Sequence, residues 1–572
     1  MDNKTIVKTL NLYVDLMTLH DENEFKIKGY NNALFNLERY NESLSQTKID
    51  DIEKIQGVGK STAKTIDELT QTGEIGALEK LKEKTPVGIM EMLKIKGLGT
   101  KKIKTIWQQM GIEDTSTLLE VIEKGELSKV KGFGEKTAQN IKEILLFIQA
   151  NKHKLHYSKA EKIANDLCDT LKKEFPNDLI EVTGEVRRKL EIINEIKLVV
   201  GTDSKQKLIN YFNSFPDIVY DEIHSGPQTW RGKLKEGGIT IIIKFSSKKR
   251  FYNTLLSTSS SPIHLSHIVK DDLTLNKIIK NNTIGSEEEA YSKIGVPFIV
   301  PEIREGQFEW EAATKDKLPK LVEMSDLKGI LHNHSTWSDG KHSLKDMAAY
   351  CHELGYQYLG ISDHSTSAFY YANGLKEERV IAQHKEIDQL NEEMTPFKIF
   401  KGIESDILPD GRLDYDDDML ASFDFIVASI HSGLSMDIKK ATDRLLTAIA
   451  NPFTTMLGHP TGRLLLQRKG YPIDHKTIID ACAEYGVIIE INANPWRLDL
   501  DWRWVHYAIE KGVMLSINPD AHEKDGYADM YYGLCVGRKG GLTADMTFNS
   551  FSLEQVQNHF SKRKKRALAQ IK

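Results

Sequence analysis

The sequence of 572 residues has only four cysteines and no long apolar run. The cysteines, Cys168, Cys351, Cys482 and Cys535, lie far apart without C-x-x-C spacing. That argues against a disulfide framework and a zinc ribbon, and it fits a reducing compartment. No segment approaches the roughly 20 apolar residues that a membrane-spanning helix needs, and the first residues lack a signal-peptide pattern. We therefore expect a cytoplasmic protein that does not associate with a membrane.

An excess of charge of one sign is also missing. The chain has 77 Lys and Arg against 82 Asp and Glu, a formal net charge of −5. Such a chain is not attracted to nucleic acid as a whole, although the average can hide local basic faces. Its length exceeds what one hydrophobic core supports, so we expect two to four domains.

A short pattern with two glycines recurs three times near the N-terminus. It reads IQGVGKSTAKTI at 55–66, IKGLGTKKIKTI at 95–106 and VKGFGEKTAQNI at 130–141. The glycines allow a tight turn, after which backbone N–H groups at a helix start lie beside a lysine and suit a phosphate oxygen. One copy would be an ordinary turn between helices, but three copies favour sequence-independent DNA binding by helix-hairpin-helix motifs. The candidate DNA-binding residues are Gly57, Gly59, Lys60, Gly97, Gly99, Lys101, Gly132, Gly134 and Lys136.

The sequence pattern changes after residue 150 and again near residue 320. From 151 to 315, helical segments alternate with short β-rich runs such as EIKLVV and GITIIIKF. A charged, proline-bearing connection follows. From 327 to 572, at least seven β-like runs are each followed by helical sequence, which predicts a parallel α/β barrel. We therefore expect three parts: 1–150, 151–315 and 327–572.

Nearly every β-like run of the third part ends in a metal-ligand residue type. A single such histidine would be an ordinary polar residue at a strand end, but in a β/α barrel all strand ends meet at one cavity. Imidazole and carboxylate together suit zinc, manganese or iron, and nine ligands exceed the needs of one ion, so we expect two or three ions. The nine residues are His332, His334, Asp339, His364, Glu404, His431, His459, Asp520 and His522.

Clustered divalent ions have a characteristic chemical use. They activate water and neutralise phosphate oxygens, which predicts phosphoester hydrolysis. Arg463 and Arg497 are candidates to hold a substrate phosphate, or equally surface residues. The candidate catalytic residues are His332, His334, Glu404, Asp520 and Arg463.

The motifs H-x-H, S-D-G, D-H, a glycine-preceded glutamate, an isolated histidine, G-H-P and D-A-H resemble the polymerase and histidinol phosphatase (PHP) domain over roughly 327–560. The order of the three parts resembles a bacterial family X DNA polymerase over nearly the whole chain. The resemblance implies helical helix-hairpin-helix modules, an α+β nucleotidyltransferase palm and a distorted (β/α)7 PHP barrel.

The resemblance also implies an activity. The implied activity is that of a manganese-dependent 3′–5′ exonuclease, which processes DNA ends or abasic sites in repair. Zinc and iron are the alternative metals. The DNA would be gapped, nicked or 3′-ended, and the protein a monomer. The family's motifs, carried over to this sequence, imply three bound ions. The ligands of the first ion would be His332, His334, Glu404 and Asp520. Those of the second would be Asp339, His364 and His522, and those of the third Glu404, His431 and His459.

The palm departs from the family's pattern. Glu185 of GEVRRK stands where a triphosphate-binding serine is expected. The paired metal-binding aspartates are replaced by Glu195 and Lys197, and the third carboxylate by Thr240. One glutamate beside a lysine cannot hold two magnesium ions, so we expect polymerase activity to be lost and the palm to position DNA, through Arg187, Arg188 and lysines.

Three alternatives stay open. The first is a small-molecule phosphatase of the histidinol-phosphate type, against which the three DNA-binding motifs count. The second is a polymerase still active with unusual ligands. The third is a non-catalytic scaffold that binds DNA ends, against which the complete set of nine ligands counts.

Overall fold

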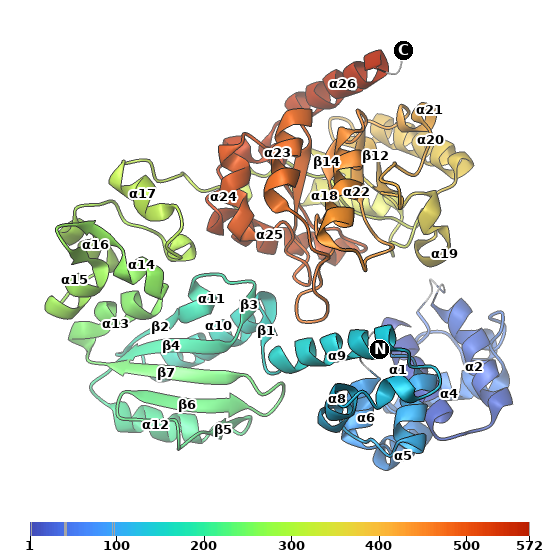
Figure 1. The fold of residues 1–572 in the computed structure, drawn as a ribbon, viewed down its shortest axis with the longest axis horizontal. Helices are drawn as coiled ribbons and strands as arrows, with labels where there is room; N and C mark the ends of the chain where they lie inside the picture. The colour runs from blue at the N-terminus through green and yellow to red at the C-terminus, as the bar shows by residue number, and fades with distance from the viewer. Residues whose placement is uncertain (2, 39, 41–42, 94, 96–97, 571–572) are drawn as a thin grey trace. The chain divides into compact units, whose positions relative to one another are not determined.

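Helices and their turns build the described residues of 1–152, the first of two compact units (Figure 1). The computed structural model describes residues 1–572 except 2, 39, 41–42, 94, 96–97 and 571–572. The helices are α1 (Asn3–Leu19), α2 (Glu24–Leu37), α3 (Ile49–Ile52), α4 (Lys60–Thr72), α5 (Gly76–Lys84), α6 (Val87–Met92), α7 (Thr100–Lys104), α8 (Thr115–Glu123) and α9 (Glu135–Ala150). Within the described residues, no helix combines the length and apolarity that crossing a bilayer requires.

The three glycine motifs form the turns that precede α4, α7 and α9. Gly59, Gly99 and Gly134 are the N-cap residues of these helices. The residue between the two glycines of each motif, Val58, Leu98 or Phe133, is buried in the core of this unit. Gly57 and Gly132 have φ of 82° and 96°, a backbone conformation that glycine adopts without strain. Gly97 lies outside the described residues.

A mixed five-stranded sheet forms the first part of the second unit, 153–572. Its order is β2 (Leu179–Thr183), β4 (Glu195–Gly201), β7 (Thr240–Ser246), β6 (Thr229–Leu234) and β5 (Ile218–Tyr220). Only β4 and β7 pair in parallel. Alternate residues of these strands, Ile196, Ile241 and Trp230 among them, pack against α10 (Tyr157–Glu174) and α12 (Lys205–Asn213).

A seven-stranded parallel sheet follows, with its strands in chain order. The strands are β10 (Gly329–Ile330), β11 (Tyr358–Ile361), β12 (Lys398–Asp406), β13 (Phe425–Ser429), β14 (Met456–Leu457), β15 (Ile488–Asn492) and β16 (Leu515–Asn518). Beyond β10 and β16, Asn333 bridges Ala521 in parallel, and the Asp520 N–H donates to the His332 carbonyl at 3.1 Å. The sheet therefore nearly closes, which confirms the predicted fold class.

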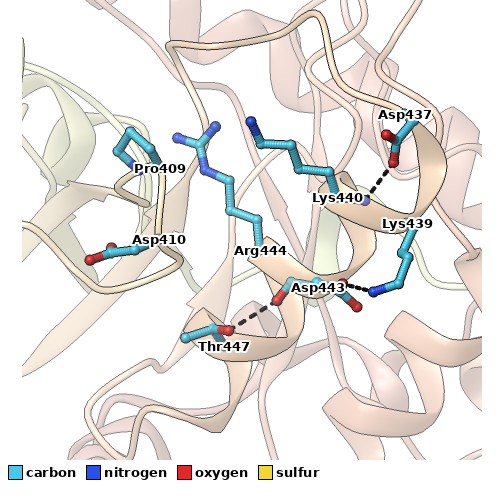
Figure 2. Close-up of a pocket in the computed structure, with 8 residues that line it drawn as sticks. All are labelled: Pro409, Asp410, Asp437, Lys439, Lys440, Asp443, Arg444 and Thr447. Carbon is cyan, nitrogen blue, oxygen red and sulfur yellow. Dashed lines mark hydrogen bonds and ion pairs between the residues drawn. The ribbon is translucent and has the colours of Figure 1, made fainter.

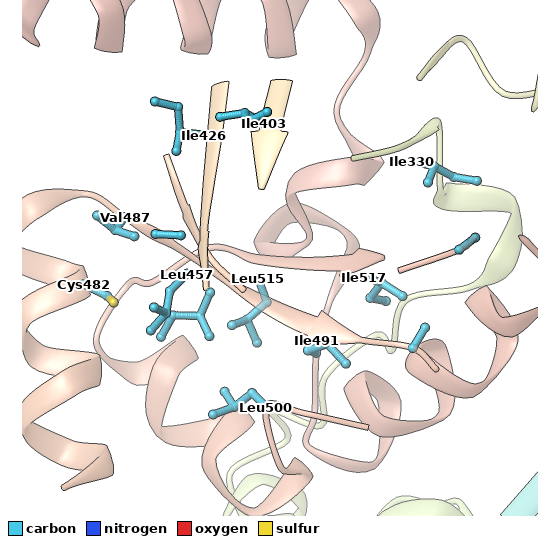
Figure 3. Packing of buried hydrophobic residues seen from close by; sticks show 14 of the residues in the cluster. Ile330, Ile403, Ile426, Leu457, Cys482, Val487, Ile491, Leu500, Leu515 and Ile517 are labelled. Atoms are coloured by element: carbon cyan, nitrogen blue, oxygen red, sulfur yellow. The ribbon is translucent and has the colours of Figure 1, made fainter. Parts of the chain in front are cut away.

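Apolar side chains fill both faces of the barrel strands. On the outer face, Ile330, Ile426 and Ile517 belong to a cluster of buried hydrophobic residues (Figure 3). The helices that contribute to this cluster include α18 (Leu344–Glu353), α20 (Glu377–Glu393), α22 (Ile438–Ala450), α23 (His475–Tyr485), α24 (Trp502–Glu510) and α25 (Met530–Lys539). On the inner face, Phe425 stacks on Phe560 of α26 (Leu553–Gln570) at 5.2 Å between ring centroids. Because this apolar plug occupies the barrel interior, the polar residues gather where the strands end.

Candidate metal centre

All nine predicted ligands lie at or just beyond the C-terminal ends of barrel strands. They are His332, His334 and Asp339 after β10, His364 after β11, Glu404 in β12, His431 after β13, His459 after β14, and Asp520 and His522 after β16. Seven of the side chains are nearly buried, whereas Asp339 and His522 are 34% and 38% exposed. Those two residues therefore mark the side from which solvent reaches the cluster.

The Glu404 carboxylate lies at the centre of the cluster. Five imidazole nitrogens, from His332, His334, His364, His431 and His459, lie 3.0–3.6 Å from its oxygens. The side chain is only 1% exposed. Because β12 lies between β11 and β13 in the sheet, a residue at its end meets ligands from both sides.

A second carboxylate, Asp520, links the first strand to the last. Its Oδ1 is 3.1 Å from His334 Nε2 and 3.6 Å from His332 Nε2. On the solvent-accessible side of the cluster, Asp339 Oδ1 lies 3.4 Å from His522 Nε2 and 3.6 Å from His364 Nε2.

Three overlapping groups have ligand atoms within 4.8 Å of one another. The groups are His334 with Asp339, His364 and His522; His332 with His334 and Glu404; and His364 with Glu404 and His431. They share members, since His334 and His364 each belong to two groups. The structure thus gathers seven of the nine residues into overlapping groups, and Asp520 and His459 adjoin them through contacts with His334 and Glu404.

Several buried ligand atoms in this cluster have no hydrogen-bond partner among the described residues. They are His332 Nε2, His334 Nδ1, His364 Nδ1, Glu404 Oε2 and His459 Nδ1. His332 Nε2 and His364 Nδ1 face the Glu404 carboxylate at 3.3 and 3.0 Å, but without hydrogen-bond geometry. A buried polar atom without a hydrogen bond costs about 1–3 kcal/mol, so five such atoms in one place require an explanation. Imidazole nitrogen and carboxylate oxygen form the donor set of manganese, zinc and iron sites. The residues therefore fit bound divalent metal ions.

The electrostatics of the cluster also favour cations. Burial lowers the pKa of His334 to about 3, and neighbouring imidazoles add to this fall. Burial opposes protonation of His431 as well, yet the Glu404 and Asp406 carboxylates raise its pKa to about 10. When no metal ion is bound, protons on some of the imidazoles neutralise the negative charge of the carboxylates. Metal binding releases such protons, because a ligating histidine is neutral.

Two carboxylates that sequence reasoning missed support the ligands from behind. Glu490 of β15 is fully buried and accepts from His332 Nδ1 at 2.6 Å and from the His459 N–H at 2.8 Å. Asp406 is 2.5 Å from His431 Nδ1. The two contacts with ring nitrogens orient the imidazoles of His332 and His431 and leave the Nε2 of each ring to face the cluster. A signal was present for Glu490, the lone acid of an otherwise apolar strand, but not for Asp406, whose strand also carries Glu404 and two lysines.

The two candidate arginines lie in different surroundings. Arg497 Nε is 3.4 Å from Asp520 Oδ2, at the edge of the cluster. Arg463 donates to the Arg497 carbonyl at 2.9 Å, to Asp501 at 2.5 Å and to the Leu498 carbonyl. All three of its guanidinium nitrogens are thus engaged with the segment that carries Arg497. A direct contact of Arg463 with a substrate phosphate stays a prediction.

A surface cavity of about 300 Å³ lies on the same barrel but outside the cluster (Figure 2). Its lining mixes charges of both signs, such as Lys440 and Asp443. Arg444 beside it donates to the carbonyls of Ile407, Leu408 and Ser432. This arginine therefore fastens the loops that follow β12 and β13 and is not free for a ligand.

In the mixed sheet, the residues at the expected polymerase positions interact with one another. Glu195 forms an ion pair with Lys197, and Thr240 lies opposite Glu195 in register. Glu185 accepts from the N–H and the side chain of Asn194 at 2.6 and 2.8 Å. The carboxylates at these positions therefore already have protein partners.

Three exposed lysines, Lys60, Lys101 and Lys136, lie in the first turns of α4, α7 and α9. They stand next to helix N-termini whose first N–H groups lack intrahelical partners. Cationic side chains beside such N–H groups suit phosphate oxygens.

Comparisons with known proteins agree with this geometry. Family profiles match 1–75 (Helix-hairpin-helix domain), 89–145 (SAM-like Helix-hairpin-helix tandem) and 331–494 (PHP domain). The chain is 34% identical, over 97% of its length and 99% of the relative, to the DNA polymerase/3′-5′ exonuclease PolX of Bacillus subtilis (strain 168). It is 26% identical, over 41% of its length and 95% of the relative, to a probable phosphatase of Thermoanaerobacter sp. (strain X514).

Proposed function

Since the chain belongs to the PolX-type family X DNA polymerases, we propose that it degrades DNA from the 3′ end at its nine-ligand centre. The match over nearly its full length shows this family membership. It is a DNA-processing enzyme with a metal-dependent phosphoesterase domain, and its helix-hairpin-helix modules bind DNA. The observation that carries the proposal is the convergence of five histidines on the buried Glu404.

We propose three divalent ions at this centre, manganese by preference, with zinc and iron as the alternatives. The proposed ligand sets are His332, His334, Glu404 and Asp520; Asp339, His364 and His522; and Glu404, His431 and His459. When bound, clustered ions supply an activated water and neutralise the charge of a phosphodiester. Glu404, which contributes to two sets, would hold two of the ions close together.

The chain's own residues then orient the substrate. Arg497, beside Asp520 and partly exposed, is placed to contact a nonbridging phosphate oxygen. Arg463 supports this contact indirectly, because it fastens the backbone of Arg497 and Leu498. Glu490 and Asp406 keep His332 and His431 in their orientation. The half-exposed side at Asp339 and His522 admits the end of a strand.

We further propose that the palm, 151–315, no longer polymerises. Lys197 neutralises Glu195, and Thr240 offers no carboxylate, so two magnesium ions lack their ligands. The helical part, 1–150, would grip gapped, nicked or 3′-ended DNA without reading its sequence, and the barrel part, 327–572, would carry the chemistry. We propose that the protein is a monomer and acts in the bacterial cytoplasm, a compartment with which the four free, buried cysteines agree.

The test is a nuclease assay on the full chain. With Mn²⁺ and a 5′-labelled strand, we expect stepwise shortening from the 3′ end, and His332→Ala or Asp520→Ala should abolish it. Both variants should also bind fewer Mn²⁺ ions by elemental analysis. His352→Ala, an exposed histidine on α18 of the same barrel, is the matched control. Full nuclease activity in the His332 or Asp520 variant would refute the assignment. Hydrolysis of histidinol phosphate with inert DNA would favour a small-molecule phosphatase.

A further inference from the structure

A short aromatic segment follows the predicted ligand His364. It includes the helical turn α19 (Phe369–Ala372). Three neighbouring aromatic side chains of this turn are exposed, Phe369 to 37%, Tyr370 to 91% and Tyr371 to 57%. Because the burial of aromatic rings is favourable, three adjacent rings that remain in contact with water indicate a binding surface.

The segment is closed at its base. The Leu375 N–H donates to the His364 carbonyl at 2.8 Å, and the Thr366 hydroxyl donates to the Leu375 carbonyl at 2.7 Å. A β-carbon on Gly374 would lie 1.9 Å from the Ser365 carbonyl oxygen, so this close approach of the two ends requires glycine. The aromatic side chains therefore project from a loop whose shape is fixed before any ligand binds.

The segment is also fastened to the metal centre, through Asp406. One oxygen of this carboxylate, Oδ1, is 2.5 Å from His431 Nδ1. The other, Oδ2, accepts from the Tyr371 hydroxyl at 3.0 Å and from the Ser367 hydroxyl at 2.6 Å. The ring centroid of Tyr371 lies 6.4 Å from that of His364. Tyr371 therefore forms part of the rim of the metal centre.

The size of this aromatic surface suits nucleobases better than a protein partner. The turn α19 has only 4 residues, whereas a stable protein interface takes about 20–30 residues on each side. An unpaired base needs only one ring, and every base offers a π-face, so stacking tolerates any sequence. Lys376 Nζ lies 4.8 Å from the Phe369 ring centroid. A cation beside exposed rings is typical of sites that bind single strands.

We propose that Tyr370 and Tyr371 form a platform on which the unpaired bases at the 3′ end of a DNA strand stack. The platform rests on the proposed function, because it is the subsite for the bases next to the phosphodiester that the metal centre holds. His364, beside Tyr371, is 3.6 Å from Asp339 on the solvent-accessible side of the cluster. A strand that enters from this side passes the platform.

The test compares exonuclease kinetics of the full chain on two DNA strands in Mn²⁺. One strand is intact, and the other carries tetrahydrofuran abasic residues at its last two positions, so it keeps the phosphates but lacks the bases. Tyr370 is varied, because Tyr371 also holds Asp406. We expect Tyr370→Ala to lower kcat/KM for the intact strand by about 5- to 100-fold, the loss of one stacked base. The ratio of kcat/KM between the intact and the abasic strand should fall by the same factor.

Two further variants establish that the ring itself is responsible. Tyr370→Phe keeps the ring and should restore most of the lost kcat/KM. Tyr485→Ala is the matched control, since Tyr485 is an exposed tyrosine at the C-terminal end of α23, away from the strand ends that carry the ligands. It should leave the ratio between the strands unchanged. A ratio in Tyr370→Ala equal to that of the unchanged protein would overturn the proposal, because the tyrosine would then act without contacting a base.

Photocross-linking separates failure of the platform from failure of the nuclease proposal. A strand with 5-iodouracil at its 3′ end is irradiated with the full chain in Ca²⁺ in place of Mn²⁺, and mass spectrometry locates the linked residue. We expect the link at Tyr370 or Tyr371, and links to other residues alone would overturn the platform. The expected link in a chain that does not cleave DNA would support the platform and refute the nuclease proposal. Cleavage from the 3′ end with an unchanged ratio in Tyr370→Ala would do the reverse.

Discussion

The substitution Glu490→Gln tests how the metal centre is held in place. Glu490 is fully buried, and its two oxygens accept from four donors: His332 Nδ1 at 2.6 Å, the His459 N–H at 2.8 Å, and the side-chain amides of Asn492 and Asn518 at 3.3 Å. Glutamine keeps the volume but offers one oxygen and two N–H donors. At least one of the two short hydrogen bonds is therefore lost, and a donor then faces a donor.

The size of the effect follows from these contacts. A hydrogen bond to a charged group contributes about 1.5–3 kcal/mol. In the variant, the partner of His332 is an uncharged amide in either orientation of the glutamine side chain. Loss of a carboxylate behind a ligating histidine typically weakens metal binding by about 10–100-fold. At roughly 1.4 kcal/mol per tenfold change, the two figures agree.

Isothermal titration of Mn²⁺ into the metal-stripped full chain measures this change directly. Glu386→Gln is the control, because Glu386 accepts from Trp337 Nε1 at 2.7 Å on the same barrel but does not contact a ligand. Circular dichroism establishes that both variants are folded. Manganese affinity within twofold of the unchanged protein in a folded Glu490→Gln would refute the reasoning. Equal weakening in Glu386→Gln would show that the effect is not specific to the ligand shell.

Two further predictions concern other parts of the chain. Lys136→Gln should lower affinity for duplex DNA without sequence preference and reduce the salt slope by about 0.9, and an unchanged slope would exclude a phosphate contact. Burial and the charge of Glu523 raise the pKa of Asp529 from 3.8 to about 7, so the folded state binds this proton more tightly than the unfolded state. The contribution of Asp529 to stability therefore falls as pH rises from about 4 to about 7, and Asp529→Asn should flatten this part of a pH series of urea unfolding.

The strand-end positions of the nine predicted ligands could be predicted because they depend on local signals. A short apolar run followed by His, Asp or Glu marks a strand end, and the topology of a parallel barrel brings strand ends together whatever the details. The sequence also predicted the fold class, because seven such runs alternate with helical segments. Glu490 and Asp406 escaped prediction, since an acidic residue in a buried strand does not indicate which imidazole it will contact.

Longer-range relationships were harder to predict. Arg463 is a charged residue in a loop, and its role depends on the return of the chain at 497–501, which its own neighbours do not encode. Lys197 and Arg231 meet across β7 only because β4, β7 and β6 are adjacent in that order. Arg187 and Arg188 pair with Glu287 and Glu305, more than 90 residues away, a pairing that periodicity cannot reveal.

The contrast between the two sites follows from how each is built. At the barrel centre, one change in a ligand leaves its partners buried without compensation, because five imidazoles depend on Glu404. Breaking such a buried network typically costs about 3–5 kcal/mol. On the sheet, Lys197 and Glu195 lie two residues apart on one strand, partly exposed, and neutralise each other without help from the rest of the fold. We therefore expect a substitution of any one predicted ligand to disturb the whole barrel centre, whereas a substitution of Lys197 or Glu195 should affect little beyond that pair.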